Sequence, residues 1–343
     1  MKKMRKIFIL IITLIISNLS FSQIPSGYYN GTEGLSGSEL KSILNNIIDG
    51  HLEYSYNDLR DFILEETDED PYNSNNIILL YTGRSQAKST FGGGANDWNR
   101  EHVWAKSHGD FGNNPPCGTD AHHIRPTDAS VNSTRGHLDF DNGGTAIYDM
   151  GDLAGYRINN VSWEPKDEVK GDVARMIFYM AVRYEGNNGE PDLEVVDYVN
   201  TYPEPKHGKL SSLMEWNNAD PPDDFEKNRN NVVYSYQQNR NPFIDHPEFV
   251  TLIWDPSASI NELSENTQKY FLSPIPAKNY CYINSTFPIN EIKNVFSVFD
   301  ITGKAIDISY SKEGNKIRMD ISNLSKGIYF VKTGNSETLK LVK

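Results

Sequence analysis

The sequence of 343 residues is poor in cysteine, which excludes a disulfide scaffold. Its two cysteines, Cys117 and Cys281, lie 164 positions apart, so they form no paired-cysteine zinc motif. Cys117 stands in a Pro-Pro-Cys-Gly turn, where we expect it to take no part in the chemistry as a nucleophile. Hydrophobic residues make up 38% of the chain and charged residues 23%, which indicates folded domains rather than disorder.

Long apolar runs are also scarce, and the main one lies at the N-terminus. Residues 1–6 carry four positive charges, residues 7–16 are apolar, and Ser20-Phe-Ser22 offers a small-x-small cleavage site before Gln23. A membrane anchor would need about 20 apolar residues, and this run ends at Ser17. The pattern predicts a signal peptide over 1–22, and hence a mature protein that is exported and keeps no stable membrane span.

Basic residues are few in the middle of the chain. The formal net charge is -13, and residues 23–265 hold 18 Lys and Arg against 40 Asp and Glu. Residues 266–343 are basic, with 11 against 6. Because phosphate binding normally leaves a basic footprint, this distribution argues against tight, non-specific binding of nucleic acid.

Hydrophobic periodicity indicates several helices and one buried strand before residue 258. A capping box over 36–39 precedes apolar residues at helical spacing, and a longer helix with one apolar face is expected around 169–184. A short, branched apolar run favours a strand. The expected elements are helices over 36–48, 57–66, 169–184, 209–216 and 225–238, and a strand over 76–82.

Beyond a linker over 259–268, the composition changes to short alternating segments separated by Gly, Asn and Ser. This pattern predicts a small all-β sandwich over 269–343, without a catalytic cluster. The segments at 272–277, 298–303 and 324–331 resemble the C-terminal sorting domain of type IX secretion. The resemblance implies the type IX secretion machinery as a partner, and export through the periplasm to the cell surface or the medium. A carbohydrate-binding or adhesion sandwich is the alternative.

Five of the eight histidines fall between residues 102 and 137, a segment with little core pattern. The strings Trp98-Asn-Arg-Glu-His-Val-Trp104, Thr119-Asp-Ala-His-His-Ile-Arg-Pro126, Asp128–Arg135 and Asn239–Pro247 resemble motifs of the endonuclease I family, secreted bacterial nucleases of the ββα-metal (His-Me finger) group. The match spans roughly 30 to 255. It implies an α+β fold, a mainly helical nuclease domain over 23–258 that contains a ββα-metal finger. The implied activity is sequence-nonspecific cleavage of DNA, with RNA as an alternative, to 5′-phosphate products.

The residue types fit that chemistry independently. Phosphodiester hydrolysis needs an activated water, a cation and fixed positive groups. His102 titrates near neutrality and is the expected general base, while Glu101 and Asn132 offer the oxygen ligands that Mg²⁺ prefers, with Mn²⁺ or Ca²⁺ as alternatives. The family's adjacent Glu-His pair and its helical asparagine ligand fall on these same three residues.

Local geometry adds further expectations. Pro126 is placed to start a helix on which Asp128, Asn132 and Arg135 would share one face, presenting Arg135 to a phosphate as a catalytic residue. Neighbours in a regular strand point to opposite faces, so Glu101 and His102 would converge only if the strand were irregular at 100–103.

Other polar residues of the segment have supporting roles in this interpretation. Arg100 and Arg125 are expected to contact substrate phosphates. His122 and His123 are expected either to brace the site by hydrogen bonding or to be buried core, and His108 and His137 to be surface or supporting groups.

Two other functions remain open at this level. A secreted, non-enzymatic protein that binds metal through its acidic and histidine-rich segment is the main alternative. A zinc hydrolase that uses three of the histidines lacks the HExxH spacing.

Overall fold

The computed structural model describes residues 24–255, 270–285, 296–314, 316–333 and 338–343. The predicted signal peptide and linker lie outside the described residues. The chain divides into two compact units, Met1–Pro256 and Ser257–Lys343, and each is described by itself.

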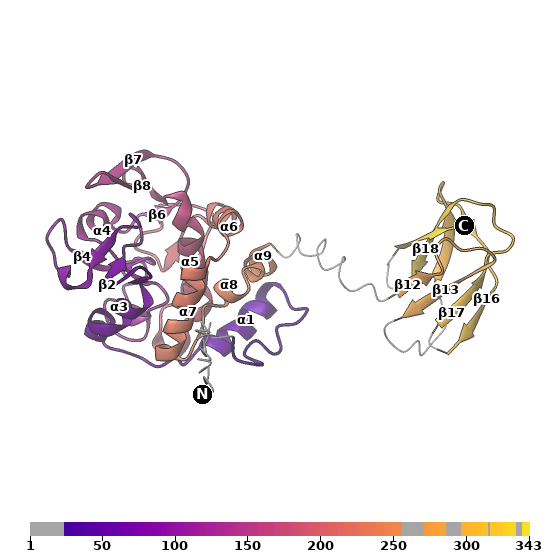
Figure 1. Ribbon diagram of the computed structural model, residues 1–343, viewed down its shortest axis with the longest axis horizontal. Helices are drawn as coiled ribbons and strands as arrows, with labels where there is room; N and C mark the ends of the chain where they lie inside the picture. Colours follow the sequence, from indigo (N-terminus) through magenta and orange to yellow (C-terminus); the bar gives the residue numbers. More distant parts are fainter. Residues whose placement is uncertain (1–23, 256–269, 286–295, 315, 334–337) are drawn as a thin grey trace, which may run out of the picture. The chain divides into compact units, whose positions relative to one another are not determined.

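Helices form the interior of the first unit (Figure 1). Helix α5 is the centre of its core, because every residue from Gly171 to Arg183 is buried. The sequence predicts one apolar face for this helix, whereas neighbouring elements cover it on all sides. The α-helices described in this unit are α1 (Gly37–Ile48), α2 (Tyr56–Asp58), α3 (Leu64–Thr67), α4 (Ala129–Arg135), α5 (Lys170–Arg183), α6 (Leu210–Ala219), α7 (Asp224–Gln237), α8 (Pro242–Asp245) and α9 (Glu248–Trp254), with a π-turn η1 (Leu59–Ile63) and 3₁₀ turns η2 (Lys88–Thr90), η3 (Cys117–Thr119), η4 (Asp167–Val169) and η5 (Asn187–Gly189).

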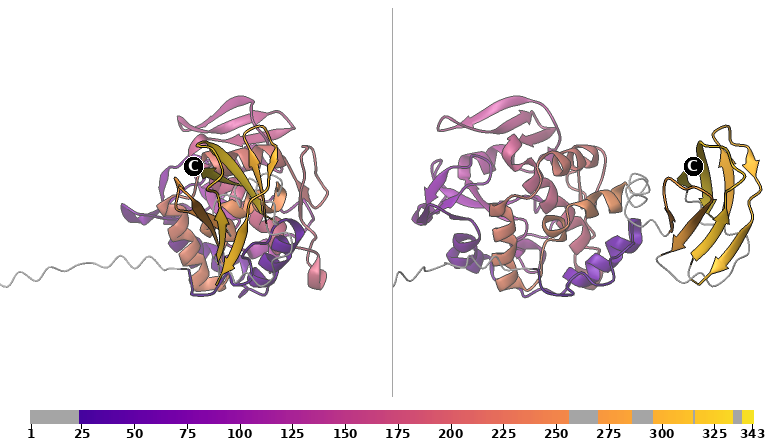
Figure 2. Two further views of the ribbon diagram at one scale, coloured as in Figure 1. Left: turned by 90° about the vertical axis from the view of Figure 1, so that its right-hand side faces the viewer. Right: turned by 45° about the vertical axis from the view of Figure 1, so that its right-hand side comes forward.

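The strands of the first unit pair in small sheets around these helices, in the orders β1-β2-β3, β4-β5, β6-β9-β8-β7 and β10-β11. The β7–β8 hairpin projects from the periphery in Figures 1 and 2. The strands are β1 (Glu69–Asp70), β2 (Asn73–Ile78), β3 (Ser85–Ala87), β4 (Trp98–His102), β5 (Ile124–Asp128), β6 (Asp139–Phe140), β7 (Thr145–Asp149), β8 (Asp152–Ile158), β9 (Ser162–Pro165), β10 (Glu194–Val195) and β11 (Lys206–His207).

The second unit is a β-sandwich. Its two four-stranded sheets have the orders β12-β13-β17-β16 and β15-β14-β18-β19. Cys281 and Ile283 of one sheet and Val331 and Leu341 of the other belong to a single buried cluster, so the sheets pack face to face. The strands are β12 (Tyr270–Ser273), β13 (Tyr280–Ser285), β14 (Phe296–Asp300), β15 (Ala305–Ile306), β16 (Tyr310–Glu313), β17 (Lys316–Asp320), β18 (Ile328–Thr333) and β19 (Thr338–Val342).

These elements confirm a mixed α and β first domain followed by a β-rich one, although the expectation of a mainly helical first domain understates its strands. The helices expected over 209–216 and 225–238 are present as α6 and α7. The helix expected over 57–66 is interrupted by the π-turn η1. The strand expected over 76–82 ends at Ile78, because the Leu80 N–H donates to the Pro126 carbonyl instead of a neighbour in its own sheet. Among the described residues, no helix has the length and apolar character needed to cross a membrane.

Candidate active site

The residues expected to carry the chemistry lie on β4, β5 and α4, which form one continuous unit. β4 pairs antiparallel with β5, and the chain passes directly from β5 into α4. The pairing is regular, with Glu101 opposite Arg125 and His102 opposite Ile124. The irregularity expected at 100–103 is therefore wrong, since an even ladder keeps Glu101 and His102 on opposite faces of β4.

Pro126 corrects a second expectation, because it lies within β5 and α4 begins at Ala129. The Val103 N–H donates to the His123 carbonyl, so by antiparallel alternation Arg100 and Pro126 form a non-hydrogen-bonded pair. A proline fits there because its missing N–H has no partner in the ladder. The expected face-sharing also fails for Asp128, whose carboxylate accepts from the Thr82 hydroxyl (2.9 Å) and pairs with Arg84 (2.6 Å).

Helix α4 lies along the free edge of β4. The same alternation directs the carbonyls of Arg100 and His102 to this edge. Asn132 Nδ2 donates to the Arg100 carbonyl (3.1 Å), and an Arg135 N–H donates to the His102 carbonyl (3.2 Å). Helix α4 is thus joined to the edge of β4 through backbone carbonyls, without a bulge in the strand.

Glu101 and Asn132 lie on the α4 side of this edge. The Glu101 side chain is buried, and its Oε1 accepts from the Tyr81 hydroxyl (2.8 Å) and pairs with Arg135 (3.3 Å). Burial raises the pKa of Glu101, and the Arg135 guanidinium opposes that rise. Asn132 is half-buried, and its Nδ2 also donates to Asn99 Oδ1 (2.8 Å). Because Nδ2 makes both hydrogen bonds, Oδ1 is the atom left to act as a ligand, and a carboxylate with an amide oxygen suits a hard cation.

His102 lies on the opposite face of β4, and a backbone carbonyl fixes its tautomer. Its Nε2 is 3.1 Å from the Gly118 carbonyl oxygen, which only accepts, so the proton lies on Nε2 and Nδ1 keeps its lone pair. The Tyr56 ring stacks on the imidazole with centroids 5.6 Å apart. Burial, followed by the nearby His123, holds the pKa of His102 well below its usual value, so the ring is neutral at pH 7.

Gly118 and Tyr81 are parts of the site that sequence reasoning missed. A Cβ at Gly118 would lie 2.6 Å from the Gly112 carbonyl oxygen, so the loop carrying the His102 partner can close only with glycine there. A glycine in a Cys-Gly-Thr string and a tyrosine in an apolar run give no signal of such contacts.

The arginines do not all have the expected role. Arg135 is fully buried and donates to the Val103 carbonyl (2.7 Å) and His207 Nε2 (3.2 Å), besides its contacts with Glu101 and His102. In this position it holds the site together and does not face a phosphate. Arg125 is also buried, where it pairs with Asp68.

Arg100 is the arginine of the three whose placement suits a phosphate contact. It is half-buried on the His102 face, with its guanidinium 3.5 Å from the centre of the Tyr56 ring.

His122 and His123 are buried core residues. His122 Nε2 lies 3.1 Å from the Asn239 carbonyl oxygen, and His123 Nε2 lies 3.0 Å from that of Cys117. Burial lowers the pKa of both rings to about 4. His123 borders the site, since its ring centroid is 5.5 Å from that of His102.

A second histidine cluster is buried behind α4, where His108, Asp139 and His207 bring one ligand atom each within 4.8 Å of one another. His108 is fully buried, so of its two expected positions, at the surface or in a supporting role, the structure excludes the first. Its ring nitrogens lie 2.7 Å from the Lys206 carbonyl oxygen and 2.8 Å from that of His137, and His207 Nε2 accepts from Arg135. Because these nitrogens already have partners, the cluster is best described as a hydrogen-bonded support for Arg135.

Comparison with known proteins defines the class of this site. Residues 36–248 match the family model described as Endonuclease I, and residues 272–343 match the model of the secretion system C-terminal sorting domain. The chain belongs to the endonuclease I family. It is therefore a nuclease, a phosphodiester hydrolase of a family that depends on divalent metal, and it is secreted or displayed at the cell surface.

Two curated relatives are similar over the first domain. The extracellular ribonuclease of Bacillus subtilis (strain 168) is 58% identical over 228 residues, which cover 66% of this chain and 78% of the relative. The extracellular ribonuclease of Bacillus amyloliquefaciens is 57% identical over the same length and shares of each chain.

Proposed function

We propose that the protein is a metal-dependent endonuclease that hydrolyses the phosphodiester bonds of both DNA and RNA without sequence preference and leaves 5′ phosphates. The observation that carries this proposal is the tautomer of His102, whose Nδ1 is free to take a proton. In the proposed reaction this nitrogen takes its proton from water, so the ribose 2′-OH is not required and either sugar is a substrate. The names of the two Bacillus relatives support RNA as one of them.

In this mechanism β4, β5 and α4 act as a ββα-metal finger. Glu101 and Asn132 would hold Mg²⁺, for which Mn²⁺ or Ca²⁺ are alternatives, and when bound the cation would stabilise the negative charge that develops on the phosphate and leaving oxygens. His102 Nδ1 accepts the proton of the attacking water. Arg100 holds a flanking phosphate, and Arg135 keeps Glu101 and the end of β4 in position.

The test is cleavage of supercoiled plasmid and of a long single-stranded RNA by purified mature protein, with Mg²⁺ and with EDTA. We expect both substrates to be cut to 5′-phosphorylated, 3′-hydroxyl products, and cutting to stop with EDTA. Binding of metal without cleavage of either polymer would favour the non-enzymatic metal-binding alternative. RNA products with 2′,3′-cyclic ends would show that the 2′-OH is the nucleophile and would contradict the role of His102.

We further propose that residues 269–343 address the protein to the type IX secretion machinery after passage through the periplasm. This sandwich has its own buried core and is matched as a sorting domain. A chain ending near residue 260 should therefore keep its specific activity in vitro but accumulate in the periplasm of its host. Normal export of that shortened chain would contradict the proposal.

A further inference from the structure

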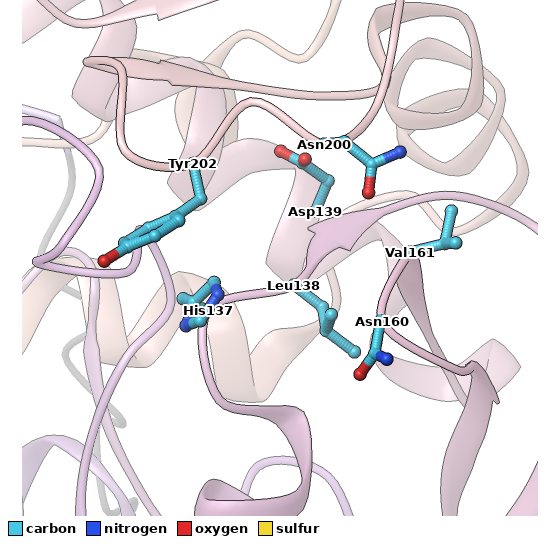
Figure 3. Close-up of a pocket in the computed structure, with 7 residues that line it drawn as sticks. All are labelled: His137, Leu138, Asp139, Asn160, Val161, Asn200 and Tyr202. Carbon is cyan, nitrogen blue, oxygen red and sulfur yellow. The ribbon is translucent and has the colours of Figure 1, made fainter.

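A small pocket lies beyond the C-terminal end of α4, outside the residues assigned to the reaction (Figure 3). Its volume is about 180 Å³, below the roughly 300–1,000 Å³ of pockets that hold a whole small-molecule ligand. The space therefore suits one flat ring system, with the rest of the ligand outside. The pocket is lined by His137, Leu138, Asp139, Asn160, Val161, Asn200 and Tyr202.

One wall of the pocket is an exposed aromatic stack. The Tyr202 and His137 rings lie face to face with centroids 4.2 Å apart, and 52% of Tyr202 is exposed. Figure 3 shows these two rings together on one side of the space, with Asn160 and Val161 on another. An exposed stack of this kind offers a free π-surface on which a further ring can stack.

The other walls supply amide groups and apolar surface. Asn160 and Asn200 are exposed, and both have backbone φ angles in the left-handed region, 59° and 65°, which asparagine tolerates better than most residues. Leu138 and Val161 add apolar contact. Amides both donate and accept hydrogen bonds, so the lining matches a ring with a mixed donor and acceptor edge.

The loop that carries Tyr202 is held in place before any ligand binds. The Thr201 N–H and hydroxyl donate to the two oxygens of Asp139 (2.9 and 2.7 Å), and the Gly208 N–H donates to the same carboxylate (2.9 Å). Asp139 is thus a buried, hydrogen-bonded anchor for this loop at the wall of the pocket. Pre-organisation of this kind reduces the entropy lost on binding.

We propose that this pocket is a subsite for one unpaired nucleobase of the substrate strand, which stacks on Tyr202 and is hydrogen-bonded by Asn160 and Asn200. The inference rests on the proposed nuclease function, because it assigns the base to the strand being cut. His137 follows Asn132 by five residues and comes two residues after the end of α4, so the subsite adjoins the helix that carries a proposed metal ligand. It predicts a preference for single-stranded substrates.

Binding is measured first, without turnover, so that it does not depend on the nuclease proposal. The full mature protein in EDTA is titrated into a single-stranded pentanucleotide with a central 2-aminopurine, whose fluorescence falls when the base stacks. We expect quenching with the wild type, about five- to hundredfold weaker binding for Tyr202→Ala, and near-complete rescue by Tyr202→Phe. Tyr72→Ala is the matched control, because Tyr72 is 97% exposed and lies outside the pocket.

Steady-state cleavage with Mg²⁺ then tests the preference. Tyr202→Ala should raise KM for single-stranded RNA by about the same factor, leave kcat unchanged, and leave duplex DNA cleavage unchanged. Equal binding of the pentanucleotide by wild type and Tyr202→Ala would overturn the proposal. Equal affinity of the wild type for 2-aminopurine riboside monophosphate and for the pentanucleotide would also overturn it, because the pocket would then be a site for free nucleotides. If the wild-type protein cleaves neither substrate but still quenches the 2-aminopurine fluorescence of the pentanucleotide, the nuclease function alone is contradicted.

Discussion

Glu101 and His102 are neighbours in the sequence, but they lie on opposite faces of β4 and have different surroundings. On the α4 face, Glu101 lies among charged and hydroxyl partners, Arg135 and Tyr81. On the other face, His102 lies against a ring, Tyr56, and a single backbone carbonyl, that of Gly118. The first environment keeps a carboxylate in position near a positive charge, and the second keeps an imidazole neutral. Adjacent residues can therefore have opposite electrostatic tasks.

The largest effect is expected from His102→Ala. It removes the proposed general base and leaves the α4 face intact, so turnover should fall by about 10²- to 10⁴-fold. The metal concentration for half-maximal activity and the melting temperature should change little. If the variant retains more than half of wild-type turnover at neutral pH, His102 is not the general base.

Comparison of Arg135→Met with Arg100→Met separates a buried support from a phosphate contact. Removing Arg135 leaves the buried Glu101 carboxylate without its counter-charge, which should lower the free energy of unfolding by about 3–5 kcal/mol. Arg100 is half-buried, so its replacement should mainly raise KM. Urea denaturation and steady-state kinetics on both variants check this. Similar stability of the two variants would contradict the structural role of Arg135.

A smaller effect is expected when Glu101 or Asn132, on the α4 face, is replaced. Glu101→Ala and Asn132→Ala should each raise the Mg²⁺ concentration for half-maximal activity, by about tenfold or more, because each removes one of the two proposed protein ligands of a cation that loses its water shell reluctantly. Asn132→Asp should restore part of the affinity. Activity measured across a Mg²⁺ series checks this, and unchanged half-saturation in both alanine variants would exclude the pair as ligands.

The histidines behind the His102 face should make the fold sensitive to acid. His122 and His123 have pKa values of about 4 in the folded protein and near 6.5 when unfolded. Between these values only the unfolded chain takes up their protons, so stability should fall as pH drops from about 6.5 to 4, by up to about 1.4 kcal/mol per pH unit for each ring. Urea denaturation at a series of pH values measures the slope. Replacement of both His122 and His123 by Gln should make the slope shallower, and an unchanged slope in that variant would contradict the prediction.

Much of this organisation could be predicted from local sequence. Apolar spacing predicted α1 and α5, and alternation with turn residues predicted the β-sandwich, because these patterns depend on neighbours a few positions apart. The capping box expected at the start of α1 is not formed, since the Ser36 side chain makes no capping hydrogen bond. The Glu101-His102 string and Asn132 could likewise be selected as candidates from residue type and family resemblance.

What the sequence by itself determined was which residues are chemically suited to the site; their final roles were decided by tertiary contacts. The sequence alone does not distinguish the roles of Arg135, Arg125 and Arg100. In the fold, Arg135 is buried beside His207 and Arg125 beside Asp68, both partners that are distant in the chain. The sequence left His108 either at the surface or in a supporting role, and the carbonyls of Lys206 and His137, which contact its ring nitrogens in the fold, decide between the two. The physical reason is that burial and hydrogen-bond partners come from chain segments brought together only on folding, and these set the pKa, tautomer and accessibility of each group.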